Sequence, residues 1–363
     1  MTASTSQQER NETKYYIGID VHKKKWVVTI RALGMFLQTF SMNPSPQELE
    51  KHLRRKYPKG KYYTVYEAGF CGFWIHRKLM SLGIESRVTN AADVPTTNKE
   101  KVNKRDKVDS KKLARELEKG DLTAIYVPEI EHQQLRSLCR LRHRYSQQIT
   151  RIKNRIKSYL YYYGIVLTDD EVASSWSSAF IRQLEEQCKK KTSGSVCLKF
   201  LIEELREQRS RMCRIVRELR KFCSKSGYAP TLNYLLTVPG IGFTTAITLI
   251  TEIIDIHRFK NLDHLCALVG LVPCTDSSGE SDRIHGLTPR KNKYLKHLVI
   301  EASWMAIRKD PQLLESFSKL IGRMRKVDAI IRIARKLLNR IRYVWKNQTA
   351  YYSPIPNPPL TAK

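Results

Sequence analysis

Four acidic residues that lie far apart in the sequence have the type and placement needed for metal-assisted chemistry. Asp20 and Glu67 each follow a short, strand-like apolar segment. Asp106 and Asp109 form a D-x-x-D pair at the start of a predicted helix, which places both carboxylates on one helical face. Mg2+ prefers oxygen ligands, and two such ions about 4 Å apart promote in-line attack on a phosphodiester. The four acids therefore predict a site for two magnesium ions.

Each acid also has an ordinary structural explanation. A carboxylate after a strand can simply begin a turn, and acids at a helix N-terminus interact favourably with the helix dipole, by about 0.3 to 1 kcal/mol each. The setting of the D-x-x-D pair favours chemistry, because segment 98–112 is strongly basic and suits phosphate binding. We interpret His22 as a packing residue or a phosphate contact. The expected nucleic-acid contacts of the basic segment are Lys104, Arg105 and Lys111.

A serine pair near the C-terminal end is the candidate nucleophile. Ser277 and Ser278 lie in the glycine-containing segment 270–280, which we expect to be an exposed loop. A serine in such a loop is accessible enough to attack phosphorus. The alternative is an ordinary Ser/Gly turn, and no neighbouring residue supplies an obvious general base. Basic residues follow the loop, and Arg290 and Lys293 are expected to bind nucleic acid.

The N-terminal third has the element order of a known fold class. Three apolar runs joined by tight polar links are typical of an antiparallel meander, and alternating helix and strand patterns follow them. The expected strands and helices are 14–20, 26–30, 34–40, helix 45–57, strand 62–66, helix 72–82, strand 84–88 and helix 107–119. This order predicts an α/β domain at 14–128 with the ribonuclease H-like (RuvC-like) fold, after a disordered leader at 1–13.

The middle of the chain has the pattern of two long helices. Apolar residues recur at three- and four-residue steps over 131–163 and again over 198–219, which is heptad spacing. We expect a coiled-coil hairpin that serves as an oligomerisation arm at 129–226. A charged helix is usually just solvated, but the first helix carries cations without balancing acids, and its tyrosines suit stacking on bases. Its expected nucleic-acid contacts are Arg136, Arg140, Arg144, Arg151 and Arg155.

The C-terminal part is predicted to form an all-α domain at 227–348, followed by a disordered Pro-rich tail at 349–363. The segment 235–253 is apolar, with a Pro-Gly-x-Gly turn between two helical runs that resembles a helix-hairpin-helix. Gly240 and Gly242 in this turn could present backbone N–H groups to a DNA phosphate, or could form a structural turn only. Further helices are expected at 261–269, 292–308 and 326–345.

The composition points to a polyanionic partner. The chain of 363 residues has 65 Lys and Arg against 35 Asp and Glu, a formal net charge of +30 that is spread over its length. Such a charge favours nucleic acid, with an anionic membrane as the rival. No apolar stretch approaches the roughly 20 residues of a membrane span, so we expect a cytoplasmic protein without a membrane partner. The 8 cysteines contain no C-x-x-C pair and are interpreted as reduced thiols.

Six motifs, taken in order, resemble the DEDD-type insertion-sequence transposases, a family that includes the pilin-gene invertases and the bridge-RNA-guided recombinases. The motifs are IGIDVHK, YEAG, D-x-x-D-S-x-K-L-A, LLTVPGIG, GLVP-x-x-x-SSG and N-x-Y-L-K, and they extend over about 15–345. The acidic tetrad of the family maps onto the four acids above, and its nucleophilic serine maps onto Ser277. Ser278 is the alternative, because Glu280 and Ser281 replace the glycine and the basic residue usual in the family.

The resemblance implies a mechanism and partners. Two magnesium ions on the tetrad would polarise a scissile phosphate while the serine attacks it and forms a covalent serine-DNA linkage. A DNA hydroxyl would then attack this linkage and complete strand exchange. Family members also use a structured guide RNA, and the two halves of their site can come from different subunits, which implies a dimer or tetramer.

Two other functions compete with this interpretation. A nuclease resembling a Holliday-junction resolvase would use the carboxylates with water as the nucleophile and would need no serine. A nucleic-acid-binding scaffold would have carboxylates that are merely structural. A covalent protein-DNA adduct would exclude the nuclease, and magnesium-dependent strand cleavage would exclude the scaffold.

Overall fold

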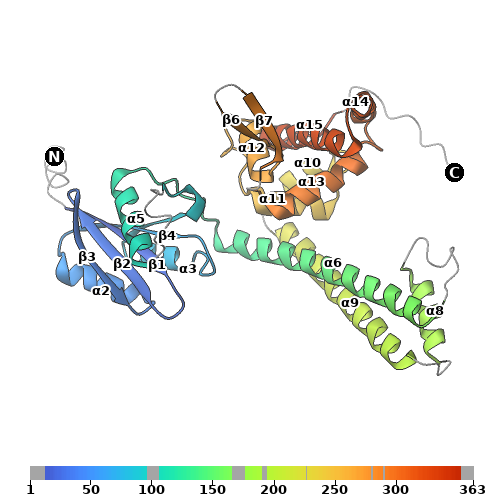
Figure 1. Cartoon of the computed structure of the whole chain (residues 1–363), viewed down its shortest axis with the longest axis horizontal. Coiled ribbons are helices and arrows are strands. Elements are labelled where there is room, and N and C mark those ends of the chain that lie inside the picture. Colours follow the sequence, from blue (N-terminus) through green and yellow to red (C-terminus); the bar gives the residue numbers. More distant parts are fainter. Residues whose placement is uncertain are drawn as a thin grey trace. The chain divides into compact units, whose positions relative to one another are not determined.

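The structure is a computed structural model, and its chain divides into two compact units, Met1–Val127 and Pro128–Lys363 (Figure 1). Side chains are described except at 106–107, 274–278 and 281–286. The described backbone covers 13–95, 106–165, 176–189, 194–225, 227–278, 281–288 and 291–352, so most of the expected leader and tail lies outside it.

The first unit is built on a five-stranded sheet in the order β3-β2-β1-β4-β5. The first three strands form the expected antiparallel meander, whereas β4 and β5 are parallel to β1. These strands are β1 (Lys14–Val21), β2 (Trp26–Ala32), β3 (Met35–Met42), β4 (Lys61–Glu67) and β5 (Glu85–Thr89). The mixed α/β arrangement and its element order are those expected of a ribonuclease H-like domain.

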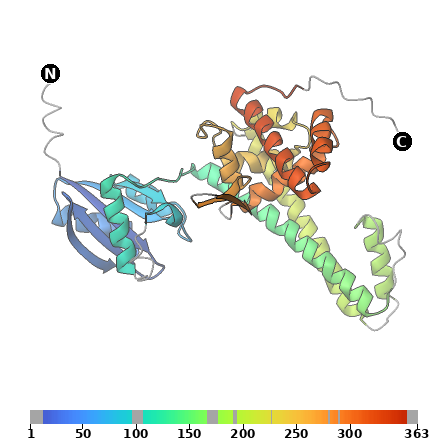
Figure 2. The ribbon, with the colours of Figure 1, turned by 45° about the horizontal axis from the view of Figure 1, so that its top comes forward.

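Helices cover both faces of this sheet, because side chains of a strand alternate between its two faces. Ile17 and Ile19 of β1 pack with the apolar sides of α2 (Pro46–Lys56) and α3 (Trp74–Ser81). The opposite face packs against α5 (Asp106–Lys119), which crosses the sheet in Figure 2. The face that carries Gly18 and Asp20 is therefore the face that meets α5.

Two long helices dominate the start of the second unit. Helix α6 (Ile130–Tyr162) and helix α9 (Ser195–Lys225) pack side by side, and α9 runs back along α6 (Figure 1). A shorter helix, α8 (Ser178–Lys189), packs on α9 and was not expected from the sequence. Ile149, Ile152 and Ile156 of α6 are buried against these two helices.

The rest of the second unit is a helical bundle with one small hairpin. Helix α15 (Lys326–Asn347) buries a stripe of residues at three- and four-residue spacing, including Ile330, Ile333 and Leu337, in a core shared with its neighbours. None of the helices in the described ranges is long and apolar enough to cross a bilayer. The bundle helices are α10 (Ala229–Leu236), α11 (Phe243–Ile253), α12 (Leu262–Val269), α13 (Lys293–Ala306), α14 (Pro311–Ile321) and α15 (Lys326–Asn347).

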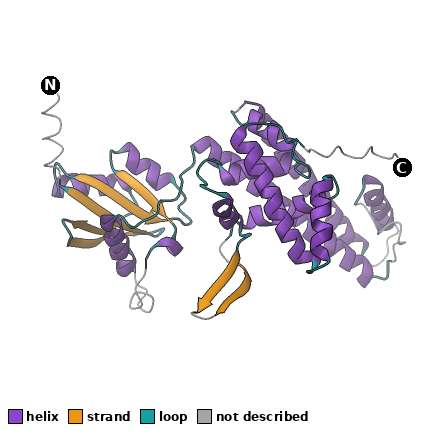
Figure 3. Ribbon diagram, turned by 90° about the horizontal axis from the view of Figure 1, so that it is seen from above, coloured by secondary structure: helices purple, strands orange, loops and turns teal. Residues whose placement is uncertain are grey.

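The serine segment differs from its predicted form. Instead of a loop, Ser277 and Ser278 are the last two residues of β6 (Pro273–Ser278), which pairs antiparallel with β7 (Ser281–Leu287). Figure 3 shows the two strands standing out from the helices. The expectation of a loop was wrong because backbone pairing stabilises a hairpin here, although the segment lacks the apolar alternation by which strands are recognised. Helix α14 was also not expected.

Candidate active site

Asp20 and Glu67 lie side by side at one edge of the sheet. The last paired residues of the parallel strands β1 and β4 are Ile19 and Tyr66, and the two acids come next on their strands. Both acids lie on the face that meets α5, because strand side chains alternate and Val65 packs on that face. The fold thus brings together two carboxylates that are 47 positions apart in the sequence.

Gly18 allows α5 to lie directly on β1. A Cβ atom at this position would lie 2.2 Å from the carbonyl oxygen of Ser110 and 2.5 Å from the backbone nitrogen of Ala114. The hydroxyl of Ser110 is buried and lies 2.9 Å from the Thr29 hydroxyl, on the neighbouring strand β2. Asp109 precedes Ser110, so the glycine fixes how closely its backbone approaches the sheet.

The direction of α5 points its N-terminus toward the two strand-end acids. At its other end, Glu118 accepts hydrogen bonds from Arg31 Nε at 2.6 Å and from Gly34 N at 2.7 Å. Arg31 pairs with Tyr16, near the start of β1, whereas Asp20 lies near its end. The D-x-x-D turn therefore lies toward the edge that carries Asp20 and Glu67.

Basic side chains accompany the acids. His22 Nε2 lies 3.1 Å from Asp20 Oδ2, and Lys112 Nζ lies 3.9 Å from Asp109 Oδ1. The Lys112 side chain is only 8% exposed, so its charge acts in a poorly solvated position. Nothing in the sequence distinguishes Lys112 from the other lysines of its basic segment. His22 was noticed by its spacing from Asp20, but not as its partner.

The four acids come from three different elements. Among residues with described side chains, no three histidine, cysteine or acidic side chains form a metal-binding group by themselves. Asp106 is the first residue of α5, and its side chain is outside the described set. Asp20, Glu67 and the first turn of α5 lie toward the same edge of the sheet, but the described acids Asp20, Glu67 and Asp109 do not form such a group. Lys104, Arg105 and Arg290 lie outside the described residues.

Several predicted nucleic-acid contacts have partners within the protein. Arg136 Nε donates to the Thr251 carbonyl at 2.8 Å, and Arg140 binds both carboxylate oxygens of Glu252, at 2.7 and 2.8 Å. Arg155 pairs with Glu204 at 3.2 Å on the exposed surface. Lys111 lies over the Phe36 ring, 4.9 Å from its centroid. Arg144 and Lys293 line a shared groove of 590 Å3 between α6 and α13.

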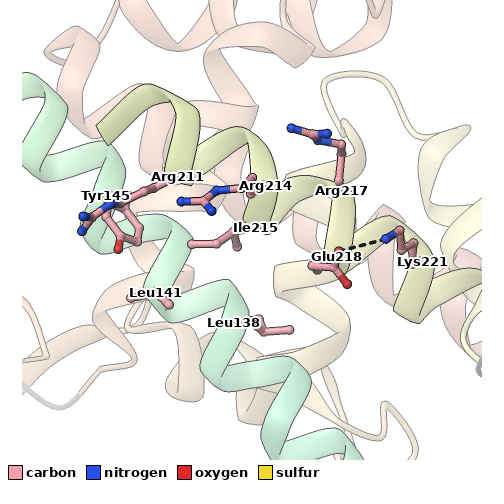
Figure 4. A pocket seen from close by; sticks show the side chains of 9 residues that line it. All are labelled: Leu138, Leu141, Tyr145, Arg211, Arg214, Ile215, Arg217, Glu218 and Lys221. Atoms are coloured by element: carbon pink, nitrogen blue, oxygen red, sulfur yellow. Dashed lines mark hydrogen bonds and ion pairs between the residues drawn. The ribbon is translucent and has the colours of Figure 1, made fainter. Parts of the chain in front are cut away.

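A second groove of 660 Å3 lies between α6 and α9 (Figure 4). Its apolar lining includes Leu138, Leu141 and Ile215, and Tyr145 lies at one end. Cations of α9 surround it, and one of them, Lys221, pairs with Glu218 at 3.0 Å. This cationic side of α9 is not evident from the sequence, because glutamates interrupt the run of basic residues. The basic residues of the groove are Arg211, Arg214, Arg217 and Lys221.

The two glycines of the Pro-Gly-x-Gly turn have different surroundings. Gly240 has φ +86°, and a Cβ there would lie 2.5 Å from the Ala302 carbonyl oxygen, so this glycine permits close packing on α13. Gly242 precedes α11, and a Cβ there would meet open space. Only the second position has room for a ligand beside its backbone.

Two family models match the chain. The model described as a transposase of the DEDD type matches residues 17–164, and the model described as "Transposase IS116/IS110/IS902 family" matches residues 232–318. Together they cover more than half of the chain. This chain belongs to the DEDD-type insertion-sequence transposases. Its family makes it an enzyme that cuts and rejoins DNA.

Individual transposases are similar over most of the chain. The Sinorhizobium fredii protein y4rJ, named as a transposase, is 27% identical over 357 residues, covering 89% of each chain. Its counterpart y4qE from the same organism is 25% identical over 295 residues, covering 80% of this chain and 71% of its own. The transposase for insertion sequence element IS1111A of Coxiella burnetii is 24% identical over 251 residues, covering 68% of this chain and 66% of its own.

Proposed function

We propose that this transposase cleaves DNA with two magnesium ions held by four carboxylates and with Ser277 as the nucleophile. The observation that carries the proposal is the convergence of β1, β4 and the N-terminus of α5 on one sheet edge. Ser278 is the alternative nucleophile. The proposed metal ligands are Asp20, Glu67, Asp106 and Asp109.

The donor set suits a hard divalent cation. All four proposed ligands are carboxylates, and Mg2+ favours oxygen ligands over nitrogen or sulfur. The close approach that Gly18 permits supports a compact set of ligands from adjacent elements. When bound, the ions would polarise the scissile phosphate and offset the charge that develops on it.

The serine step conserves the number of phosphate ester bonds. The Ser277 oxygen forms a bond to phosphorus, the bond from phosphorus to one DNA sugar oxygen breaks, and that oxygen takes up the serine proton and leaves as a sugar hydroxyl. In the second step a DNA hydroxyl attacks the same phosphorus and forms a new DNA linkage, and the serine oxygen leaves with the proton of that hydroxyl. The free energy of the broken phosphodiester bond is retained in the serine-DNA bond, so rejoining needs no nucleotide cofactor.

The second unit is proposed to bind nucleic acid and to assemble subunits. We infer that α6 and α9 form a coiled-coil arm that joins a dimer or tetramer, and that α10 and α11 act as a helix-hairpin-helix with Gly242 facing a phosphate. The Arg144 and Lys293 groove and exposed Arg151 add positive charge for DNA. The groove between α6 and α9 has cations beside a tyrosine and apolar residues, a combination that suits unpaired bases of a structured guide RNA.

A search for the covalent intermediate tests the proposal. The protein is incubated with Mg2+, DNA of the element ends and the transcript that flanks the element, and is then denatured. We expect a denaturant-resistant protein-DNA species that Ser277→Ala abolishes and Ser278→Ala retains. Asp20→Asn should abolish it as well. Cleavage without any adduct would instead identify a nuclease that uses water, and binding without cleavage would identify a scaffold.

A further inference from the structure

A buried carboxylate lies where two helices of the second unit meet the base of the serine hairpin. The Glu252 side chain is 2% exposed, although it lies on the otherwise apolar helix α11. Burial alone would raise its pKa, but the hydrogen bonds and charge of Arg140 outweigh burial and lower the pKa. Glu252 is therefore charged at neutral pH, and its charge is compensated inside the protein.

Two residues from different elements donate hydrogen bonds to the Glu252 carboxylate. Arg140 of α6 binds it through two nitrogens, at 2.7 and 2.8 Å, and its guanidinium also lies over the Tyr294 ring, 5.0 Å from the centroid. The side-chain amide of Asn292 donates to Glu252 Oε2 at 2.8 Å. Glu252 thus joins α6 to the residue at which α13 begins.

Asn292 also closes the base of the hairpin. Its Oδ1 accepts from the backbone nitrogens of Tyr294 and Leu295, which caps α13, and its own N–H donates to the Leu268 carbonyl at 2.9 Å. The amide of Asn292 has one oxygen and one NH2 group, so fixing the NH2 on Glu252 also fixes the oxygen on the cap.

The two ends of the hairpin segment are held together at the same place. The Thr288 N–H donates to the Val272 carbonyl at 3.0 Å. Gly270 has φ +81°, and a Cβ there would lie 2.3 Å from the Lys291 Cβ, so the chain that enters β6 touches the chain that follows β7. The position of Asn292 therefore helps to set the direction in which the hairpin leaves the bundle.

We propose that Glu252 is a positioning residue that orients the serine hairpin through Asn292, with Arg140 holding the carboxylate in place. The proposal rests on the proposed function of Ser277 as nucleophile. A purely structural ion pair would predict that activity falls only as much as the folded fraction does. A positioning role predicts a loss of adduct formation in protein that is still folded.

Exchanging the hydrogen-bond donor at Asn292 with the acceptor at Glu252 distinguishes a positioning role from a purely structural one. Asn292→Asp keeps a good helix cap but places a second carboxylate against Glu252 and removes the donated hydrogen bond. Glu252→Gln places an amide where Arg140 and Asn292 both need an acceptor. In the double variant the glutamine NH2 takes the place of Oε2 and donates to the aspartate, so the bond between the two positions is restored with its direction reversed. The glutamine oxygen still accepts from Arg140 Nε, and the new aspartate supplies the negative charge that Arg140 loses at Oε2.

The expected result is a rescue of serine-DNA adduct formation. Each single variant should lower the adduct rate by about 100-fold, the usual effect of misplacing a reacting group by about 1 Å, and the double variant should recover to within about 5-fold of wild type. Asp310→Asn is the matched control, since Asp310 is also a buried carboxylate that caps a helix, α14, and pairs with an arginine, Arg340. It should lower the melting temperature and leave the adduct rate per folded molecule unchanged.

Amide hydrogen exchange gives a second reading that does not depend on the nucleophile. Exchange at the Thr288 and Asn292 amides should accelerate by at least about 10-fold in both single variants and return to the wild-type rate in the double variant. Single variants with wild-type exchange and adduct rates, or a double variant that is no better than either, would overturn the proposal. Absence of adduct in the wild-type protein would overturn Ser277 as nucleophile, and the exchange rates would still decide whether Glu252 orients the hairpin base.

Discussion

The contact between Gly18 and α5 gives a direct test of how the acidic site is assembled. In Gly18→Ala, the new Cβ would lie 2.2 Å from the Ser110 carbonyl oxygen, whereas ordinary van der Waals contact starts at 3.4 Å. The two atoms nearest to the new Cβ, the Ser110 oxygen and the Ala114 nitrogen, belong to the backbone of α5 and cannot rotate away. The whole helix must therefore move away from β1 by about 1 Å. Overpacking of this kind costs about 1 to 3 kcal/mol of unfolding free energy.

The effect on catalysis should exceed the effect on stability. Asp106 and Asp109 move with α5, and displacing a reacting constellation by about 1 Å lowers rates by about 100-fold. We would measure cleavage of element-end DNA under single-turnover conditions, and unfolding free energy by urea titration. Gly227→Ala is the control, because a Cβ at that position meets open space. Cleavage within about 3-fold of wild type for Gly18→Ala would refute the argument that this contact sets the metal site.

Three further predictions concern other parts of the chain. His22→Ala should lower magnesium-dependent cleavage by about 10- to 100-fold, because His22 lies 3.1 Å from Asp20 Oδ2 and orients a proposed ligand; unchanged dependence on Mg2+ concentration would contradict this. Burial lowers the pKa of His132 below its ordinary value of 6.5. The unfolded chain therefore binds a proton at this position more readily than the folded protein does, so unfolding free energy should fall as pH drops below about 6.5, and His132→Asn should reduce that slope in urea titrations at pH 7.5 and 5.5. Burial raises the pKa of Cys139 and Cys223 to about 11, so iodoacetamide at pH 8 should modify exposed Cys213 at least about 100-fold faster than either, as followed by peptide mass spectrometry.

The sequence predicted the sheet well because its strands are short apolar runs bounded by polar links. Each expected strand of the first unit begins and ends within two residues of the observed one, and the long helices α6 and α9 were found from heptad spacing. The strand-end position of Asp20 and Glu67 followed from the same pattern. Their adjacency did not, because it depends on β1 pairing with β4 rather than on either segment alone.

Features held by long-range contacts escaped prediction. The β6–β7 hairpin has polar strands, so no alternation of apolar residues marked it. Glu252 is a single acid in an apolar helix, and nothing local indicates that its partners come from positions 140 and 292. The same holds for Arg136 and Arg140, whose sequence pattern is that of a solvated basic face although their guanidinium groups bind α11.

The length of α6 limits how far apart two partners bound along this helix can lie. At 1.5 Å per residue, its 33 residues form a rod about 50 Å long. A duplex covers that distance in about 15 base pairs, at about 3.4 Å per step, which is about one and a half helical turns. The bundle packs along α6 as far as Thr150, so the Tyr162 end of the helix extends about 18 Å beyond it, and changing the length of α6 by whole turns would move that end in steps of about 5.4 Å.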